Sequence, residues 1–168
     1  MTGAIWAAVA ILGFVTLQRL VELRLADDNS QRLLAEGAVE HAPGHYPFIV
    51  GLHMTWLAAL WWWAPGRAIN VPLLLVFVLL QLGRVWVIKT LGARWTTRII
   101  VKPGAPLVQS GPYRFVNHPN YVIVTAEIAV LPLVFGLWQI SLVFSVLNLV
   151  ILAIRIRAEN VALRNLRG

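Results

Sequence analysis

The chain has 168 residues, of which 59% are hydrophobic and only 12% are charged, and its formal net charge is +7. A soluble domain has about a quarter of its residues charged, so this composition indicates one polytopic membrane domain instead. The absence of cysteine excludes disulfides, thiolate metal sites and cysteine nucleophiles. The positive charge does not predict nucleic-acid binding, because Lys and Arg beside apolar segments usually report membrane topology.

Five apolar segments are predicted to be membrane-spanning helices, since each approaches the roughly 20 residues that cross the hydrocarbon core. The first has no basic leader and no small-residue cleavage site, so we expect a retained helix rather than a signal peptide. A polar loop with one short interfacial helix is expected over residues 26–46, and a longer polar connection over residues 89–120. The five spans run from about Ile5 to Leu25, Pro47 to Trp63, Val71 to Ile88, Tyr121 to Phe135 and Ile140 to Ile154.

Basic residues are distributed unequally between the two sides of this arrangement. The positive-inside rule predicts that the basic side is cytoplasmic and that the N-terminus lies outside. The opposite side has only Arg67. The basic side has eleven residues: Arg24, Arg32, Lys89, Arg94, Arg98, Lys102, Arg114, Arg155, Arg157, Arg164 and Arg167.

Several polar side chains fall inside the predicted spans. Arg19 and Glu22 are three residues apart and share a helical face, so they can pair within the protein or lie at headgroup level. Glu127 lies within the fourth span, where a carboxylate needs a partner. His53, alone in an apolar span, more often makes a helix-to-helix hydrogen bond than acts as a base.

The connection over residues 89–120 predicts a small cytoplasmic β-hairpin. The segment from Trp95 to Val101 is rich in β-formers, the segment from Lys102 to Pro106 contains turn residues, and Leu107 to Gln109 is expected to return as the second strand. His41, His45 and Glu40 have a spacing that permits metal binding, but they lack a third convincing ligand, so no metal site is predicted. There is no Gly-rich nucleotide-binding motif, P-loop or metalloprotease motif.

The segment from Gly111 to Tyr121 combines glycine, prolines, histidine and tyrosines, which favour a fixed loop over a membrane span. The turn at residues 136–139 is so short that the last two spans must pack antiparallel. The end of the fifth span, with Arg155 and Glu159 four residues apart on one face, is therefore expected beside this loop. Together the two segments predict a cytoplasmic pocket, although a topological anchor and an ordinary surface pair also explain the two charges.

These residues resemble a known family. The runs Gly111-Pro112-Tyr113-Arg114 and His118-Pro119-Asn120-Tyr121, a helical hairpin, and then Arg155 with Glu159 are similar to the isoprenylcysteine carboxyl methyltransferase family of integral membrane enzymes. The N-terminal pattern around Arg19, Glu22, Gly37, His45 and His53 looks like a bacterial branch. Some members of that branch methylate long-chain alkylpyrones.

The resemblance implies an all-α membrane methyltransferase that binds S-adenosylmethionine on the cytoplasmic side of a bacterial plasma membrane. It implies a lipophilic acceptor that is methylated on a carboxyl, enol or hydroxyl oxygen. Arg155 and Glu159 are implied as catalytic and cofactor-binding residues. The other implied cofactor contacts are Leu107, Val108, Gly111, Tyr113, His118, Pro119, Asn120 and Tyr121.

We assign the acceptor side to the first three spans, residues 1–88, with Arg19, Glu22, His45 and His53 as contacts, and the cofactor side to residues 89–168. Two positions depart from the family pattern: Asn117 stands where arginine is usual, and Asn160 where a second glutamate is common. The chain also ends before the longer tail of eukaryotic members, which favours small lipid-like acceptors over prenylated proteins. Alternatives are a phospholipid N-methyltransferase and a non-enzymatic transporter subunit or scaffold. The sequence does not predict an oligomeric state.

Overall fold

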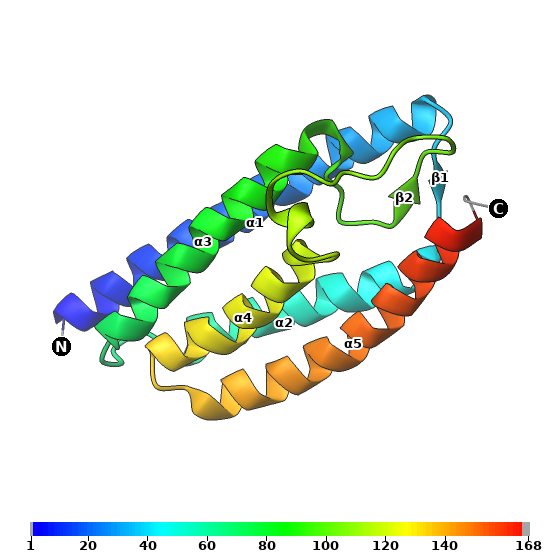
Figure 1. Ribbon diagram of the computed structural model, residues 1–168. Coiled ribbons are helices and arrows are strands. Elements are labelled where there is room, and N and C mark those ends of the chain that lie inside the picture. Colours follow the sequence, from blue (N-terminus) through cyan, green and yellow to red (C-terminus); the bar gives the residue numbers. More distant parts are fainter. Residues whose placement is uncertain (1, 166–168) are drawn as a thin grey trace.

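A computed structural model describes residues 2–165. In this part of the chain five α-helices run in alternating directions along the molecule (Figure 1). Short 3-10 turns and one small sheet connect them at one end. The elements are α1 (Thr2–Ala35), β1 (Val39–Glu40), η1 (Pro43–His45), α2 (Tyr46–Trp63), α3 (Val71–Leu91), η2 (Gly92–Arg94), β2 (Ile100–Val101), η3 (Gly111–Arg114), α4 (Pro119–Val134) and α5 (Trp138–Asn165).

Helix α4 packs against both α3 and α5, as the short turn before α5 predicts. At Gly83 of α3 the two helices come so close that an added Cβ would lie 3.3 Å from the side chain of Ile123 on α4. The hydrophobic core lies where the first halves of α1 and α3 meet the second halves of α2 and α4. Its largest members include Leu12, Trp56, Leu60, Phe77, Leu131 and Phe135. The opposite half of the bundle is therefore left for polar groups.

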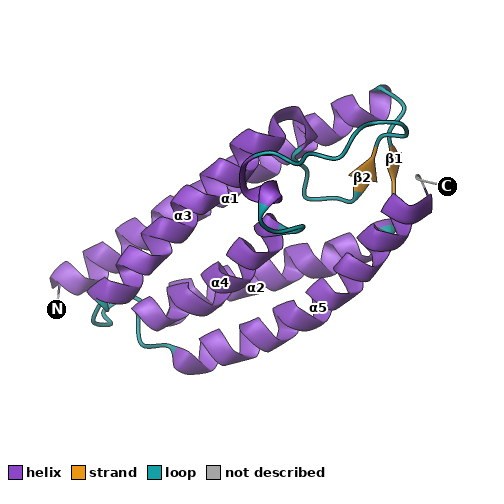
Figure 2. Ribbon diagram, in the orientation of Figure 1, coloured by secondary structure: helices purple, strands orange, loops and turns teal. Residues whose placement is uncertain are grey.

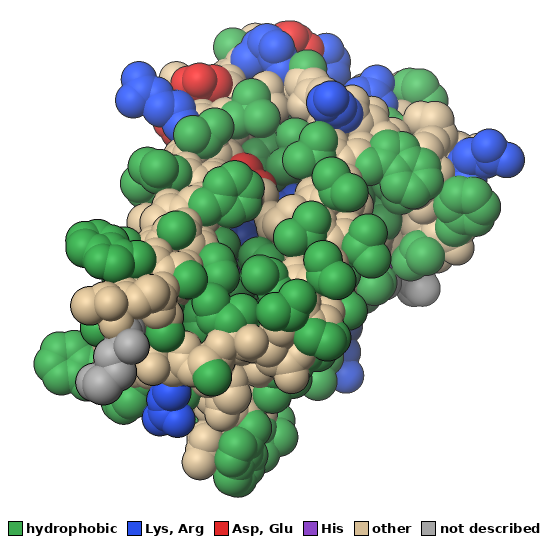
Figure 3. All heavy atoms as spheres, turned by 90° about the vertical axis from the view of Figure 1, so that its left-hand side faces the viewer, with side chains coloured by type: hydrophobic (Ala, Val, Ile, Leu, Met, Phe, Trp, Pro, Cys, Tyr) green, Lys and Arg blue, Asp and Glu red, His purple; other side chains and the backbone are tan. Residues whose placement is uncertain are grey.

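Within the described part of the chain, three helices are long and apolar enough to cross a membrane: residues 2–35, 71–94 and 138–159. Helix α4 is apolar but shorter, and the boundaries of α2 and α3 agree closely with the predicted spans. Hydrophobic side chains cover most of the face in Figure 3, whereas Lys and Arg gather toward its upper end. This surface is typical of an integral membrane protein.

Residues 26–35 are not the expected polar loop with one short interfacial helix, because α1 continues without a break for ten residues beyond Leu25. This polar extension is held against the end of α3. Asn29 donates hydrogen bonds to the carbonyls of Gly92 and Trp95, at 3.2 and 2.8 Å, and Arg32 donates one to the carbonyl of Ala93. The helix ends only where Gly37 adopts a positive φ of 83°. Tertiary hydrogen bonds thus extend a helix that hydropathy alone would end.

The predicted β-hairpin is also wrong in its pairing. Residues 100–101 do form a strand, but its antiparallel partner is β1, with Val39 opposite Val101 and Glu40 opposite Ile100 (Figure 2). The segment from Leu107 to Gln109 is not a strand. The extension of α1 places residues 39–40 at the end of the bundle, next to residues 100–101, with which they pair. The sheet therefore ties the first connection to the third.

The end of α1, the connection between α3 and α4, and the end of α5 lie at the same end of the molecule (Figure 1). These are the three segments that the sequence analysis assigns to the basic side. The positively charged segments therefore meet in space, at the end opposite the hydrophobic core.

Candidate functional site

A cavity of about 1060 Å³ lies in the polar half of the bundle. All five helices contribute to its wall, together with the connection between α3 and α4. Polar and charged side chains from α4, α5 and the connection line one part. Apolar side chains of α1 and α2, such as Leu20, Leu23, Val50 and Met54, line another. The cavity can therefore hold a ligand with a polar part and an apolar part.

Tyr121 joins the two charged residues of α5. Its hydroxyl donates a hydrogen bond of 2.5 Å to Oε2 of Glu159 and accepts one of 3.3 Å from Nε of Arg155. The guanidinium of Arg155 also lies over the Tyr121 ring, 5.6 Å from its centroid. His118 stacks on the same ring at 5.2 Å, and its Nδ1 is 3.6 Å from the Glu159 carboxylate. The first turn of α4 and the last turns of α5 thus form one polar group, as their antiparallel packing predicts.

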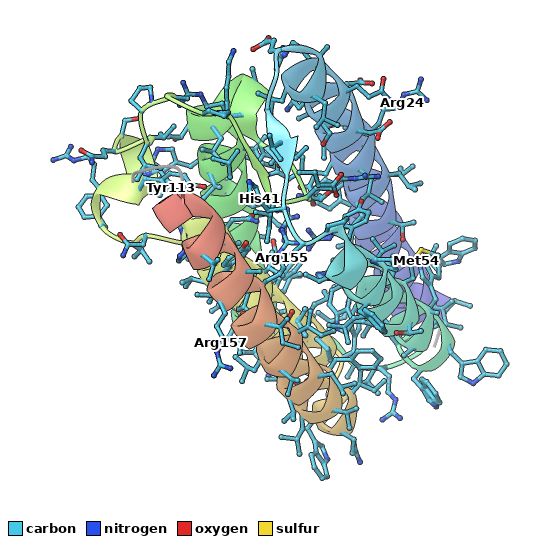
Figure 4. All side chains as sticks on the ribbon, turned by 90° about the vertical axis from the view of Figure 1, so that its right-hand side faces the viewer. Arg24, His41, Met54, Tyr113, Arg155 and Arg157 are labelled. Atoms are coloured by element: carbon cyan, nitrogen blue, oxygen red, sulfur yellow. The ribbon has the colours of Figure 1, made fainter. Side chains whose placement is uncertain are left out.

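Arg155 is the most buried charge of this group, with 5% of its surface exposed. Figure 4 shows that its side chain turns toward the interior, whereas the exposed Arg157 turns away. Its hydrogen-bond partners among the described residues are both uncharged: the Tyr121 hydroxyl and, at 2.8 Å, the carbonyl of Thr97. A buried cation without an anionic partner is costly. The site is therefore suited to an anionic ligand group.

Tyr113 also lines the cavity. Burial raises the pKa of its phenol to about 12, and the negative charge of Glu159 adds to the effect. Gly111, which begins η3, holds the loop against α3. It has a positive φ of 55°, and an added Cβ would lie 2.5 Å from Oγ1 of Thr90. Only glycine fits this position without a shift of its surroundings.

A buried charge cluster forms another part of the cavity wall. Arg84 of α3 donates two hydrogen bonds to Glu22 of α1 and one of 2.9 Å to Glu127 of α4. Arg19 donates to the same two carboxylates, and Gln81 donates to Glu127 at 2.8 Å. The cluster holds two cations and two anions, so its formal charge is zero. The expectation that Glu127 needs a partner is confirmed.

The cavity brings together most of the residues predicted from the sequence. Eleven line it: Arg19, Glu22, His53, Leu107, Val108, Tyr113, His118, Asn120, Tyr121, Arg155 and Glu159. Gly111 and Pro119 do not. Gly111 packs on α3 and Pro119 is buried at the start of α4, so both shape the backbone of the loop and do not contact a ligand in the cavity. The side chain of His45 lies outside the described part of the structure. No cluster of three metal-ligating side chains occurs among the described residues.

Sequence reasoning missed several contributors to the cavity wall: Arg84 of the charge cluster, Thr97 and Tyr46. Thr97 supplies its backbone carbonyl to Arg155, a role that no side-chain pattern reveals. The hydroxyl of Tyr46 is hydrogen-bonded to the hydroxyl of Thr97 at 3.2 Å, and the guanidinium of Arg98 lies over the Tyr46 ring. Arg98 in turn pairs with Glu40 of β1 at 3.2 Å. The signal available in the sequence was the position of Tyr46 at the start of a span.

Comparison with known proteins shows the family to which the chain belongs. The chain is 35% identical to the uncharacterized protein YpbQ of Bacillus subtilis (strain 168) in an alignment of 172 positions, which covers 95% of this chain and 96% of that protein. No solved structure matches the chain. Residues 73–165 match the isoprenylcysteine carboxyl methyltransferase (ICMT) family, and this range includes the motif loop, the helical hairpin and Glu159. The chain therefore belongs to the isoprenylcysteine carboxyl methyltransferase family, a family of membrane methyltransferases.

Proposed function

We propose that this protein transfers the methyl group of S-adenosylmethionine to an oxygen of a lipophilic small molecule. The observation that carries the proposal is the buried Arg155 with its two uncharged partners, at the polar end of a cavity whose other part is apolar. We place this polar end on the cytoplasmic side and the N-terminus outside, because the basic segments meet there.

The residues present fit the cofactor. Arg155 offers a buried cation to its carboxylate, and Glu159 offers an acceptor to its ammonium or ribose hydroxyls. Asn120 lines the same cavity, and its Oδ1 is buried with no hydrogen-bond partner among the described residues, so it is an acceptor that an amino group of the cofactor can satisfy. When bound, S-adenosylmethionine supplies an electrophilic methyl group on a sulfonium sulfur.

The protein's contribution is mainly positioning and exclusion of water. Tyr121 holds Arg155 and Glu159 in fixed relative positions, and the charge cluster fixes α1, α3 and α4 around the cavity. Holding two reactants in a reactive arrangement can supply about 7–11 kcal/mol of the barrier reduction. Such a site needs few dedicated acid and base groups.

The apolar part of the cavity supports entry of the acceptor from the lipid. Leu20 of α1 and Met54 of α2 line the cavity and are also exposed on the outer surface of the bundle. Figure 4 shows Met54 on the side of α2 that faces away from α5. A long hydrocarbon chain can lie between these side chains while its reactive end reaches the polar region.

Calorimetric titration of S-adenosylmethionine into the protein in lipid nanodiscs tests the proposal. We expect saturable binding that is weakened at least about tenfold in Arg155→Met, because loss of a charge-assisted hydrogen bond costs about 1.5–3 kcal/mol. Arg157→Met removes an exposed arginine two residues away and should bind as the wild type does. Absence of binding by the folded wild type would overturn the proposal.

A further inference from the structure

His53 has a fixed ring orientation on the wall of the cavity. Its Nδ1 lies 2.8 Å from the carbonyl oxygen of Ile49, one turn earlier in α2. A carbonyl oxygen only accepts hydrogen bonds, so Nδ1 must carry the proton and donate it. In the neutral imidazole the other nitrogen, Nε2, is then an unprotonated hydrogen-bond acceptor.

The same bond determines where Nε2 lies. Because Nδ1 turns back toward the helix backbone, Nε2 is on the opposite edge of the ring. Nε2 has no hydrogen bond to any of the described residues. The side chain therefore presents a lone pair that the protein itself does not use.

The other basic groups of the cavity wall are already engaged or charged. The arginines Arg19, Arg84 and Arg155 are hydrogen-bond donors without a lone pair. Each carboxylate among the described lining residues accepts a hydrogen bond from a neighbouring side chain: Glu22 from Arg84, Glu36 from Lys102 and Glu159 from Tyr121. His118 also lines the cavity, but its Nδ1 lies 3.6 Å from the Glu159 carboxylate, in the polar group proposed to hold the cofactor. Among the described lining residues outside that polar group, Nε2 of His53 is thus an unprotonated nitrogen left available to the acceptor.

We propose that His53 is a catalytic residue that orients the hydroxyl or enol of the acceptor and takes its proton. The inference rests on the proposed methyl transfer. The acceptor oxygen forms a bond to the methyl carbon, its O–H bond breaks, and the proton moves to Nε2. The electron pair of the broken carbon–sulfur bond stays on sulfur, and the imidazolium later releases its proton to water.

This role sets a preference among oxygen acceptors. A hydroxyl has a proton to donate to Nε2, so it is both held and activated there. An ionised carboxylate has no proton to donate, so its oxygens cannot form a hydrogen bond with the unprotonated Nε2. We therefore expect His53 to matter most for weakly acidic acceptors and least for acceptors that are already ionised.

The first experiment measures binding without a methyl donor. The probes are para-decylphenol and its methyl ether, para-decylanisole, titrated into the protein in nanodiscs. The wild type should bind the phenol more tightly than the ether. His53→Gln, which keeps a hydrogen-bond acceptor, should retain this preference, and His53→Phe should lose it. Thr55→Ala is the control, because Thr55 bonds a carbonyl of the same helix but does not line the cavity. An unchanged preference in His53→Phe would overturn the inference.

The second experiment measures turnover with labelled S-adenosylmethionine and acceptors of increasing acidity. These are para-decylphenol, its ortho-nitro derivative and dodecanoic acid. His53→Gln should lower kcat for the phenol by about 10²-fold or more, the usual contribution of a general base. The loss should shrink for the nitrophenol and disappear for the acid. An equal loss with all three acceptors would indicate a structural role and overturn the inference.

The outcomes for His53 and for the proposed function can be distinguished. Binding of S-adenosylhomocysteine is measured in each variant, and it should remain at the wild-type level. If the wild type binds neither S-adenosylmethionine nor S-adenosylhomocysteine, the proposed function fails. The phenol preference of the wild type and of His53→Phe still tests the hydrogen bond to Nε2 in that case.

Discussion

Arg84 donates two hydrogen bonds, each of 2.6 Å, to the two carboxylate oxygens of Glu22. This bidentate pair joins α3 to α1, and a third bond from Arg84 to Glu127 joins both helices to α4. Two parallel bonds to a carboxylate are among the stronger polar contacts in proteins. The cluster thus fixes three helices around the cavity.

Removal of one charge from this cluster should destabilise the protein strongly. Glu127→Ala leaves Arg19 and Arg84 with a single buried carboxylate between them, which we expect to cost about 3–5 kcal/mol. The measurement is thermal unfolding in detergent, followed by tryptophan fluorescence. Arg67→Ala, which removes an exposed arginine, is the control. Equal melting temperatures for Glu127→Ala and the wild type would contradict this role of the cluster.

Gly111 should tolerate alanine less well than Gly104 does. Both have a positive φ, 55° and 74°, but an added Cβ at Gly104 meets nothing within 4 Å. Gly104→Ala should therefore cost only the backbone strain of about 1–2 kcal/mol. Gly111→Ala adds a clash with Thr90, and it should also weaken S-adenosylmethionine binding, because η3 carries Tyr113. Comparable unfolding temperatures and affinities for the two variants would show that the close approach to α3 is unimportant.

Asn29 should stabilise the polar extension of α1. Its amide donates to the Gly92 and Trp95 carbonyls and is buried, so Asn29→Ala leaves both carbonyls without this partner. We expect a loss of about 1–3 kcal/mol in unfolding free energy. The neighbouring Asp28 is exposed, and Asp28→Ala is the matched control. Hydrogen exchange of residues 26–35 reports the effect locally, and equal exchange in the two variants would contradict it.

Tyr113 should make the stability depend on pH in the alkaline range. Its pKa is about 12 in the folded protein against 10.0 for an ordinary tyrosine, because burial opposes ionisation. The unfolded chain therefore releases this proton first as the pH rises, and folding stability falls between pH 10 and about 12. Below pH 10 the group has no effect. Tyr113→Phe should show a shallower decline over that range in a series of thermal melts. Parallel curves for the two proteins would contradict the buried, neutral phenol.

Sequence reasoning predicted the helical hairpin and the meeting of the Tyr121 loop with Arg155 and Glu159, because a short turn leaves the last two helices only one way to pack. It also predicted that Glu127 needs a buried partner. Hydropathy alone did not predict the extension of α1, since that depends on carbonyls more than sixty residues away, at Gly92 and Trp95.

The strand pairing failed for a related reason. A local hairpin is the default for two nearby β-forming segments, and nothing in residues 39–40 distinguishes them as a strand. Their pairing with residues 100–101 follows from where α1 ends in space. The wall of the cavity likewise includes a backbone carbonyl, that of Thr97, which residue type cannot indicate.

The most direct measurement of the central claim is transfer of a labelled methyl group. The purified protein in nanodiscs of bacterial lipid is incubated with methyl-labelled S-adenosylmethionine and a bacterial lipid extract, and the organic phase is analysed for labelled product. We predict a labelled lipophilic ether or ester, formed by the wild type and Arg157→Met but not by Arg155→Met or Glu159→Ala. A wild type that binds the cofactor but labels nothing in the extract, or equal labelling by all four proteins, would contradict the account.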